Sequence, residues 1–381
     1  METMGFFEVL ATTIELSDPR VDRGQNHCLK DMVALAVCGT ICGANSWAEM
    51  ERFAVAHEDW FRRFLVLENG IPSHDTFGRV FAQLDTAQFY DCVLRWISQL
   101  DLSLRNCAIN VDGKTLRGSH DRDAGQPPLH IVSAWANELK ICIGQQAVDS
   151  KSNEIPAVQE LLEMLNLEGA IVTMDAMHCQ KATLRKIELR GADYVVPVKG
   201  NQEKLHSRLR KEVDGWAAKN FEVARLRTHS KSERSHGRQE TRTCMVHPAP
   251  SDLKKQWPGL QTIGIILRER VLPNGKQSSE STVFISSLPA RVGQHVQLLR
   301  KHWGVENELH YTLDVTFRED ASRIRKGAGP AISGGLRRLA LSILKSDTTI
   351  NDNVRGKRQI AGWNPGNPET ILNGFQDKLA A

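Results

Sequence analysis

Residues 106–112, with the sequence NCAINVD, decide the fold class of this chain, because a short apolar run there ends on a carboxylate. Residues 170–175, AIVTMD, repeat this arrangement, and residues 194–198 form a third short apolar run. Runs of this length bounded by polar residues predict buried strands. An expected hairpin over 129–148, followed by helices that alternate with the later strands, predicts a mixed sheet covered by helices, which is an α/β fold.

The residues before this region have a helical pattern. Apolar side chains recur at helical spacing from Leu29 to Leu84, and Ser46 and Ser73 stand at short breaks where helices are expected to begin. Residues 1–100 therefore predict a compact helical bundle. The most common role of such a bundle is structural packing, and the alternative interpretation is a DNA-binding helix-turn-helix.

The residues after it change pattern twice more. Residues 200–290 predict a polar helix at 202–216 and then strands near 222–226, 240–246, 262–270 and 281–287. A helical block at 294–313 and 336–346 follows. The tail, residues 351–381, carries Gly, Pro and Asn, and we expect it to be irregular.

The composition is that of a globular protein with a mild basic excess. The chain has 381 residues, 41% of them hydrophobic and 25% charged, so a sizeable core and more than one folded unit are expected. Its 49 Lys and Arg against 45 Asp and Glu give a net charge of +4, which permits nucleic-acid binding without demonstrating it. Residues 199–242 hold 12 Lys or Arg and 6 Asp or Glu, so the excess is concentrated there. This segment is either a solvated basic face or a surface that follows phosphates.

The eight cysteines and the apolar runs indicate the compartment. No two cysteines form a Cys-x-x-Cys pair, so neither a zinc ribbon nor a thioredoxin-type motif is indicated, and we expect several to be small core residues. This usage fits a reducing cytoplasm. The longest apolar run, residues 32–42, is too short to span a bilayer, and the N-terminus lacks the pattern of a signal peptide. We therefore expect a cytoplasmic protein with no membrane partner.

Three carboxylates stand where a fold of this class can gather them. Asp112 and Asp175 each end an apolar strand, and open α/β sheets place their sites in the crevice at strand ends. The alternative for each is a turn-forming aspartate. Glu306, on an expected helix, is the third candidate. Three such groups could hold two Mg²⁺ ions, which prefer hard oxygen ligands, and this arrangement suits phosphodiester chemistry.

Two alternatives exist for the third position. Four other acidic residues are not excluded by sequence spacing alone: Glu308, Asp314, Glu319 and Asp320. In addition, His302, Glu306 and His310 recur every four residues, so they could share one helix face as zinc ligands do. Zinc signatures use other spacings, however, and a solvated helix face explains the same pattern more simply.

Several blocks of sequence, in order along nearly the whole chain, resemble one known family. They are PSHDTF at 72–77, VDGKTLRGS at 111–119, DAMH at 175–178, YVVPVKGNQ at 194–202, HWGVEN at 302–307 and LDVTFRED at 313–320. On these blocks the chain resembles the DDE transposases of the H-repeat-associated group, which are found in insertion sequences and beside Rhs elements. The number and order of the blocks make the resemblance specific.

The resemblance implies a fold and a catalytic set. It implies a ribonuclease-H-like catalytic core with a β-rich insertion and an N-terminal helical domain. The expected bounds are 1–100 for the helical domain, 101–199 and 291–350 for the core, 200–290 for the insertion and 351–381 for the irregular tail. Asp112, Asp175 and Glu306 would be both the catalytic residues and the ligands of Mg²⁺, for which Mn²⁺ could substitute.

The DNA contacts are predicted from shorter sequence patterns than the catalytic residues. We expect five residues to contact DNA: Lys199, Asn201, Arg300, Lys301 and His302. Simpler interpretations are a turn for the first two and ordinary surface charge for Arg300 and Lys301. Related transposases carry a Tyr-x-x-Arg-x-x-x-Glu-x-x-x-x-x-x-Lys signature, which here has Leu299, His302 and Leu313 in place of the Tyr, Arg and Lys.

The resemblance also implies an activity and partners. We expect Mg²⁺-dependent phosphodiester hydrolysis and strand transfer at insertion-sequence ends, on double-stranded DNA, with a homodimer in the DNA complex and a place at the cytoplasmic nucleoid. The alternative is a catalytically inactive, DNA-binding remnant of a transposase. All three acidic positions are intact, which argues against the remnant.

Overall fold

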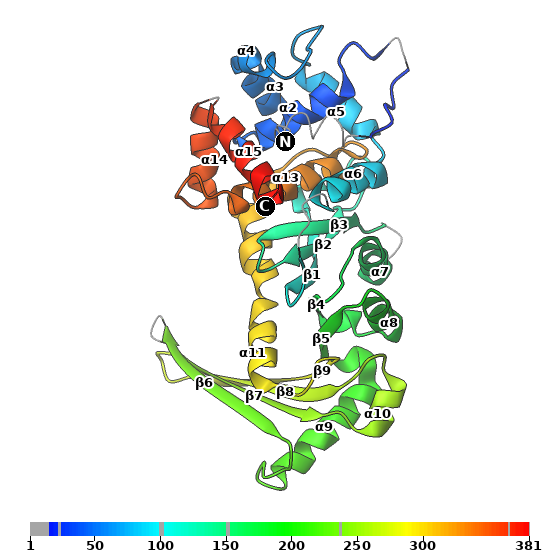
Figure 1. Cartoon of the computed structure of the whole chain (residues 1–381), viewed down its shortest axis with the longest axis vertical. Helices are drawn as coiled ribbons and strands as arrows, with labels where there is room; N and C mark the ends of the chain where they lie inside the picture. The colour runs from blue at the N-terminus through cyan, green and yellow to red at the C-terminus, as the bar shows by residue number, and fades with distance from the viewer. Residues whose placement is uncertain are drawn as a thin grey trace. The chain divides into compact units, whose positions relative to one another are not determined.

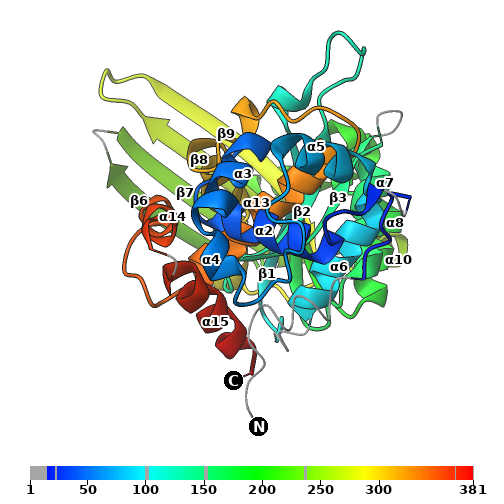
Figure 2. The same cartoon turned by 90° about the horizontal axis from the view of Figure 1, so that it is seen from above.

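The computed structural model describes residues 15–21, 24–98, 103–149, 153–235, 238–364 and 366–380. The chain divides into two compact units (Figures 1 and 2). Unit 1 consists of Met1–Ser103, Gly113–Ala157 and Glu306–Ala381, and unit 2 of Leu104–Asp112 and Val158–Val305. This division differs from the four expected domains, because the N-terminal helices share a unit with the last helices and with a hairpin from the middle of the chain.

The described strands form a large mixed sheet in the order β3-β2-β1-β4-β5-β9-β8-β7-β6. Their bounds are β1 (Ala108–Thr115), β2 (His130–Ala136), β3 (Ile141–Ala147), β4 (Ile171–Met174), β5 (Asp193–Val198), β6 (Arg227–Ser235), β7 (Arg238–Pro248), β8 (Thr262–Val271) and β9 (Gln277–Ser286). Strand β1 begins in unit 2 and ends in unit 1. The expected α/β class is therefore confirmed.

In unit 2, strands β1, β4 and β5 are parallel, and β9, β8, β7 and β6 continue from β5 as an antiparallel ribbon. The helices of this unit are α8 (Lys181–Leu189), α9 (Glu203–Ala217), α10 (Ser251–Gln256) and α11 (Val292–Lys301), with most of α7 (Glu154–Met164). Figure 1 shows α9 and α11 on opposite faces of the ribbon. The prediction of a strand at 222–226 is wrong. The backbone of Arg225 is left-handed (φ 66°) and turns the chain there, and β6 begins only at Arg227.

The core of unit 2 lies between this sheet and α11. All four residues of β4 are buried, as the unbroken apolar run predicts for a strand covered on both faces. The buried cluster consists of Ala108, Ile171, Val195, Cys244, Val246, Phe284, Leu288 and Leu298. Leu298 of this cluster belongs to α11. Its burial holds one face of α11 against the sheet, whose strands carry site residues.

Unit 1 is built around α13 (Gly329–Ser346), which is buried on nearly every side. Its other helices are α2 (Leu29–Ile41), α3 (Trp47–Ala56), α4 (Glu58–Phe61), α5 (His74–Gln83), α6 (Thr86–Ser98), α12 (Tyr311–Val315), α14 (Val354–Trp363) and α15 (Gly366–Ala380). Both expected caps are confirmed: the hydroxyl of Ser46 accepts from the Glu49 amide and that of Ser73 from the Thr76 amide, each at 3.3 Å. Of the expected N-terminal segment, residues 1–14, 22–23 and 99–100 lie outside the described residues.

The prediction of an irregular tail is wrong, because residues 354–363 form α14 and residues 366–380 form α15. The side chain of Asn353 caps α14 by accepting from the Gly356 amide at 3.0 Å. Phe375, on α15, is fully buried and packs against Trp96 of α6. Burial of such side chains outweighs the low helix propensity of the Gly and Asn residues, because propensity is a weak prior.

The expected helix at 294–313 is interrupted. After α11 the chain makes a π-helical turn, η5 (Val305–His310), before α12 begins at Tyr311. Such turns are rare and occur often at functional sites. The turn contains Glu306, so its altered repeat changes where that side chain projects relative to a regular helix.

Two expectations about cysteines and membranes can be compared with the structure. Six of the eight cysteines are buried, namely Cys38, Cys92, Cys107, Cys142, Cys179 and Cys244, and none of the eight forms a disulfide. Their expected role as small core residues is thus confirmed. None of the helices described has the length and apolar character needed to cross a membrane.

Candidate active site

The two expected aspartates come together in unit 2. Strands β1 and β4 are parallel neighbours, and Val111 stands opposite Met174. Asp112 is the next residue of β1, and Asp175 is the extended residue that follows β4, so their backbones continue this register. Neighbouring strands lie about 4.8 Å apart, so this register predicts that the two side chains project from the same face of the sheet. The Asp175 carboxylate is 61% exposed and therefore open to a ligand.

A chain of buried polar side chains lies beneath these aspartates. Asn110 donates from Nδ2 to the Thr173 hydroxyl at 2.6 Å, and both side chains are almost fully buried. The Thr173 hydroxyl lies 3.1 Å from Nδ1 of His302. Because strand side chains alternate, Asn110 is on the same face as Asp112, and Thr173 on the same face as Asp175. The sequence analysis did not identify these two residues, although both stand two positions before an aspartate.

His302 completes this chain. Its Nε2 lies 3.4 Å from Oδ1 of Asp175. The Asp175 carboxylate can only accept, so Nε2 of His302 is assigned the ring hydrogen, and the Thr173 hydroxyl can then donate to Nδ1 while it accepts from Asn110. This order of donors fixes the orientation of the imidazole, and the imidazole in turn positions the Asp175 carboxylate.

The surroundings keep Asp175 ionised. The hydrogen bond from His302 lowers the pKa of Asp175 below its ordinary value, and this outweighs the opposite effect of partial burial. The positive charge of Lys199 acts in the same direction. Asp175 is therefore an anionic oxygen donor at neutral pH, as a hard cation requires.

The residues expected to contact DNA all lie in unit 2. Lys199 is exposed just beyond β5, the strand next to β4. Asn201 donates from Nδ2 to the backbone oxygen of Ala176 at 2.8 Å, so it joins the loops that follow β4 and β5. Arg300 is 60% exposed on α11 and pairs with Glu233 of β6 at 3.2 Å. Lys301 follows Arg300 at the end of α11.

Glu306, the third expected ligand, is the first residue of the last segment of unit 1, and it is exposed on the π-helical turn. It forms no ion pair with any residue that the structure describes. The register of β1 and β4 gives Asp112 and Asp175 corresponding positions within unit 2, whereas the described residues contain no group of three His, Cys, Asp or Glu side chains arranged to hold a metal ion.

The rival acids are each engaged by a cation within unit 1. Glu308 lies 2.6 Å from Nζ of Lys140 and 3.2 Å from Nζ of Lys345. Lys114 pairs with Asp314 at 2.8 Å and with Asp320 at 3.0 Å. The fourth, Glu319, is fully buried and pairs with Arg338 at 2.9 Å. These acids contribute to the packing of unit 1, whereas the Glu306 side chain is exposed.

The zinc alternative finds no support in the structure. Both ring nitrogens of His302 face side chains of unit 2, namely those of Thr173 and Asp175. His310 is largely enclosed in unit 1, where burial and the nearby cations Arg338 and Lys114 lower its pKa to about 3. A site beside two fixed cations is unfavourable for Zn²⁺. The π-helical turn also breaks the four-residue repeat on which this alternative depends.

The glycine after Asp112 leaves space for two neighbouring side chains. A β-carbon on Gly113 would overlap the Glu154 carboxylate and the His130 ring, which pair with each other. His130 Nδ1 also lies 2.8 Å from the Thr115 hydroxyl. Asp112, Gly113 and Lys114 of β1 therefore have different roles. Asp112 is a candidate site carboxylate, and Gly113 leaves space for the His130–Glu154 pair. Lys114 is a buried cation that pairs with acidic residues after Glu306.

Comparisons with known proteins show the family of the chain. Residues 104–342 match the family model described as "Transposase DDE domain", and residues 11–97 match the one described as "DDE_Tnp_1-associated". The chain is 35% identical to the H repeat-associated putative transposase YhhI of Escherichia coli (strain K12), over 91% of this chain and 93% of that protein. It is also 35% identical to the putative transposase YncI of Escherichia coli O157:H7, over 94% and 92% of the two chains.

One relative has a different description. The protein named inactive transposase YbfQ, of Escherichia coli (strain K12), is 42% identical over 57 residues. This match covers 15% of the present chain and 68% of that protein. Its name is a reason to test activity directly.

Proposed function

Because this chain belongs to the family of proteins with a transposase DDE domain, we propose that it cuts and joins DNA at the ends of an insertion sequence. The observation that supports the proposal is the register of β1 and β4, which pairs Val111 with Met174, the residues immediately before Asp112 and Asp175. Residues 101–199 and 291–350 would form a ribonuclease-H-like core, with residues 200–290 as an insertion and residues 1–100 as an associated helical domain.

Asp112, Asp175 and Glu306 are proposed to hold Mg²⁺, for which Mn²⁺ could substitute. The donors suit such an ion, because they are carboxylates and the charge on Asp175 is maintained by His302 and Lys199. When bound, Mg²⁺ would favour ionisation of the attacking hydroxyl and offset the charge that develops on the leaving oxygen. His302 orients the Asp175 carboxylate, and Glu306 would complete the ligand set from the π-helical turn.

In the proposed reaction, water first breaks the phosphodiester at the transposon end and leaves a 3′-hydroxyl. That hydroxyl then attacks a phosphodiester of the target, so one phosphorus–oxygen bond forms as another breaks and no oxidant or reductant is needed. Four residues, Lys199, Asn201, Arg300 and Lys301, would position the duplex through its phosphates, which fix register without reading sequence. Pairing of two ends would involve a homodimer.

Chelation of the metal tests the chemistry. Purified protein, incubated with a plasmid that carries the gene with its own flanking DNA, is expected to cut at the flanks when Mg²⁺ is present. We expect EDTA to abolish cleavage and excess Mg²⁺ or Mn²⁺ to restore it, because phosphodiester hydrolysis loses several kcal/mol of charge stabilisation without the ion. Gel mobility in the same buffers would show whether DNA is still bound. Binding without cleavage under every metal condition would identify an inactive remnant instead.

A matched pair of glutamines tests the third ligand. We expect Glu306→Gln to reduce cleavage by about 10³-fold or more with little change in stability, because an exposed carboxylate is removed from the proposed metal site. Glu308→Gln is expected to lower the free energy of unfolding by about 1–3 kcal/mol, since Lys140 and Lys345 lose a charged partner. Cleavage rates at saturating Mg²⁺ and melting temperatures, measured for both variants, distinguish a ligand from a structural residue. The reverse pattern would assign the role to Glu308.

A further inference from the structure

A pocket of about 330 Å³ lies in unit 1, and none of its lining residues is among those assigned above. It is lined by one side of α14 together with Cys42, Gly43 and Thr316. Arg355, Gln359 and Trp363 of α14 line it at a spacing of four residues, so they share one helix face. We call these three residues the α14 face.

The side chains of the α14 face are open to solvent. Trp363 is 76% exposed, which is unusual for an indole, and Arg355 and Gln359 are exposed as well. A cation, an amide and a flat aromatic ring therefore line the same side of the pocket. Large exposed aromatic rings rimmed by polar groups commonly mark binding sites.

A buried cation adds positive charge to this pocket. Arg358, also a lining residue, is 5% exposed, and its guanidinium donates to the backbone oxygens of Thr40, Ala44 and Thr316 and to the amide oxygen of Asn45. The guanidinium also stacks on the Phe317 ring, 4.3 Å from its centroid. All these partners are uncharged, and within the described residues Arg358 has no carboxylate at ion-pair distance, Glu49 acting on it only from further away.

The charge of Arg358 persists at neutral pH. Burial lowers the pKa of Arg358 to about 10, which still leaves the guanidinium protonated. Arg355 contributes a second positive charge, and none of the described residues that line the pocket is an Asp or Glu. The lining of the pocket therefore carries a net positive charge next to an exposed aromatic ring, and its chemical complement is an anion that also offers flat or apolar groups.

We propose that the α14 face is a second DNA-binding surface, on which duplex DNA lies with a phosphate against Arg355 and a sugar or base edge against Trp363. Arg358 attracts the phosphate from its buried position, where four of its five N–H donors are already used. This inference rests on the proposed function, which supplies DNA as the ligand. It extends the DNA contacts from the strand ends and α11 of unit 2 to a helix that the sequence analysis expected to be irregular.

The test measures duplex binding by fluorescence anisotropy over a range of salt concentrations, with a labelled duplex taken from the gene's flank. We expect Arg355→Gln and Trp363→Ala each to weaken binding roughly tenfold. Arg355→Gln should also reduce the slope of log affinity against log salt by about 0.9, the value for one lost phosphate contact on duplex DNA. Both residues are exposed, so the melting temperature should not change.

Two control variants match these changes elsewhere. Arg105→Gln removes the same charge from a side chain that is 71% exposed in unit 2, and Phe221→Ala removes another exposed ring. We expect both to bind the duplex within about twofold of wild type. Equal weakening by Arg105→Gln would overturn the proposal, because the effect would then come from net charge alone.

The remaining outcomes separate this inference from the function on which it rests. If wild type binds and cuts DNA and the α14 variants bind normally, the inference is wrong and the function stands. If wild type binds but never cuts, and the α14 variants bind more weakly, the inference stands and the enzymatic function is wrong. If Trp363→Ala changes the molar mass by light scattering and leaves DNA affinity unaltered, the face is a subunit interface and the inference is rejected.

Discussion

Replacing Asp112 or Asp175 with asparagine is expected to abolish DNA cleavage while DNA affinity stays within about threefold of wild type. Asparagine keeps the shape of the side chain and removes the charge that a divalent cation needs, and loss of several kcal/mol of transition-state stabilisation corresponds to about 10³-fold or more in rate. Gel-resolved cleavage of a supercoiled plasmid and anisotropy with a short duplex measure the two quantities separately.

The control for these variants lies on the same sheet. Asp193 stands at the amino end of β5, where its Oδ1 accepts from the Ser287 hydroxyl at 2.6 Å. The amide oxygen of asparagine can accept the same bond, so Asp193→Asn should cut DNA at the wild-type rate. Cleavage that survives in both Asp112→Asn and Asp175→Asn would remove the basis of the proposed site, since the register of β1 and β4 would then have no catalytic meaning.

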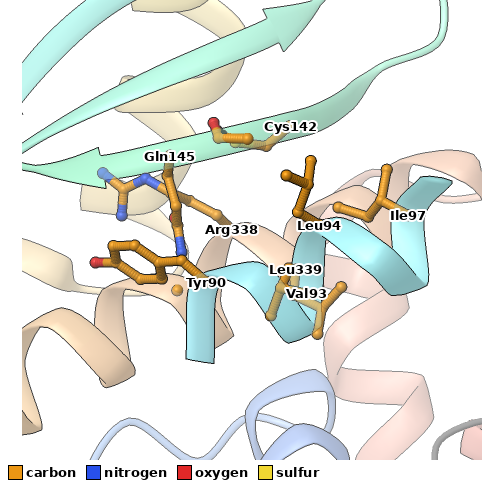
Figure 3. A pocket seen from close by; sticks show the side chains of 10 residues that line it. Tyr90, Val93, Leu94, Ile97, Cys142, Gln145, Arg338 and Leu339 are labelled. Carbon is orange, nitrogen blue, oxygen red and sulfur yellow. Dashed lines mark hydrogen bonds between the residues drawn. The ribbon is translucent and has the colours of Figure 1, made fainter. Parts of the chain in front are cut away.

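The largest expected effect on stability comes from Arg338 in α13. Its guanidinium bonds to Glu319 and to the Ser133 hydroxyl, each at 2.9 Å, and both charged side chains are at most 2% exposed. Figure 3 shows Arg338 beside Gln145 and Tyr90, which line a small cavity with it. Arg338→Met is expected to lower the free energy of unfolding by about 3–5 kcal/mol, because it leaves the buried Glu319 carboxylate without its nearest cation.

Denaturant unfolding of three variants would measure this effect. Arg62→Met removes one partner of an exposed helical pair with Glu58 and should cost less than about 1 kcal/mol. Replacing both charges, as in Arg338→Met with Glu319→Leu, should recover much of the loss, because no uncompensated charge remains. A loss below about 1 kcal/mol for Arg338→Met alone would show that the pair contributes little to holding α13 against β2.

Much of the fold follows from local sequence. The apolar runs ending on Asp112 and Asp175 became β1 and β4, because an unbroken run of this length is stable as a strand buried on both faces. Ser46 and Ser73 cap their helices for a reason contained within three residues. Features of this kind depend on neighbours in the chain, and the sequence displays those neighbours directly.

The errors have a common cause in distant contacts. The tail from residue 351 is helical because α14 and α15 bury side chains such as Phe375 against residues far away in the sequence. The helix that carries Glu306 contains a π-helical turn that no periodic pattern indicated. In both cases tertiary packing outweighs a local preference, which contributes well under 1 kcal/mol per residue.

The candidate site also combines features set by local sequence with features set by contacts between distant residues. The sequence by itself determined that Asp112 and Asp175 follow the fully buried runs of β1 and β4, because burial of an apolar run and the exclusion of charge from the core are local properties. Only the tertiary structure decided that β1 and β4 are parallel neighbours in matching register, that His302 reaches Asp175, and that cations engage the acids that rival Glu306. Those outcomes depend on pairs such as Lys114 and Asp314, which are 200 residues apart and meet only when the chain has folded.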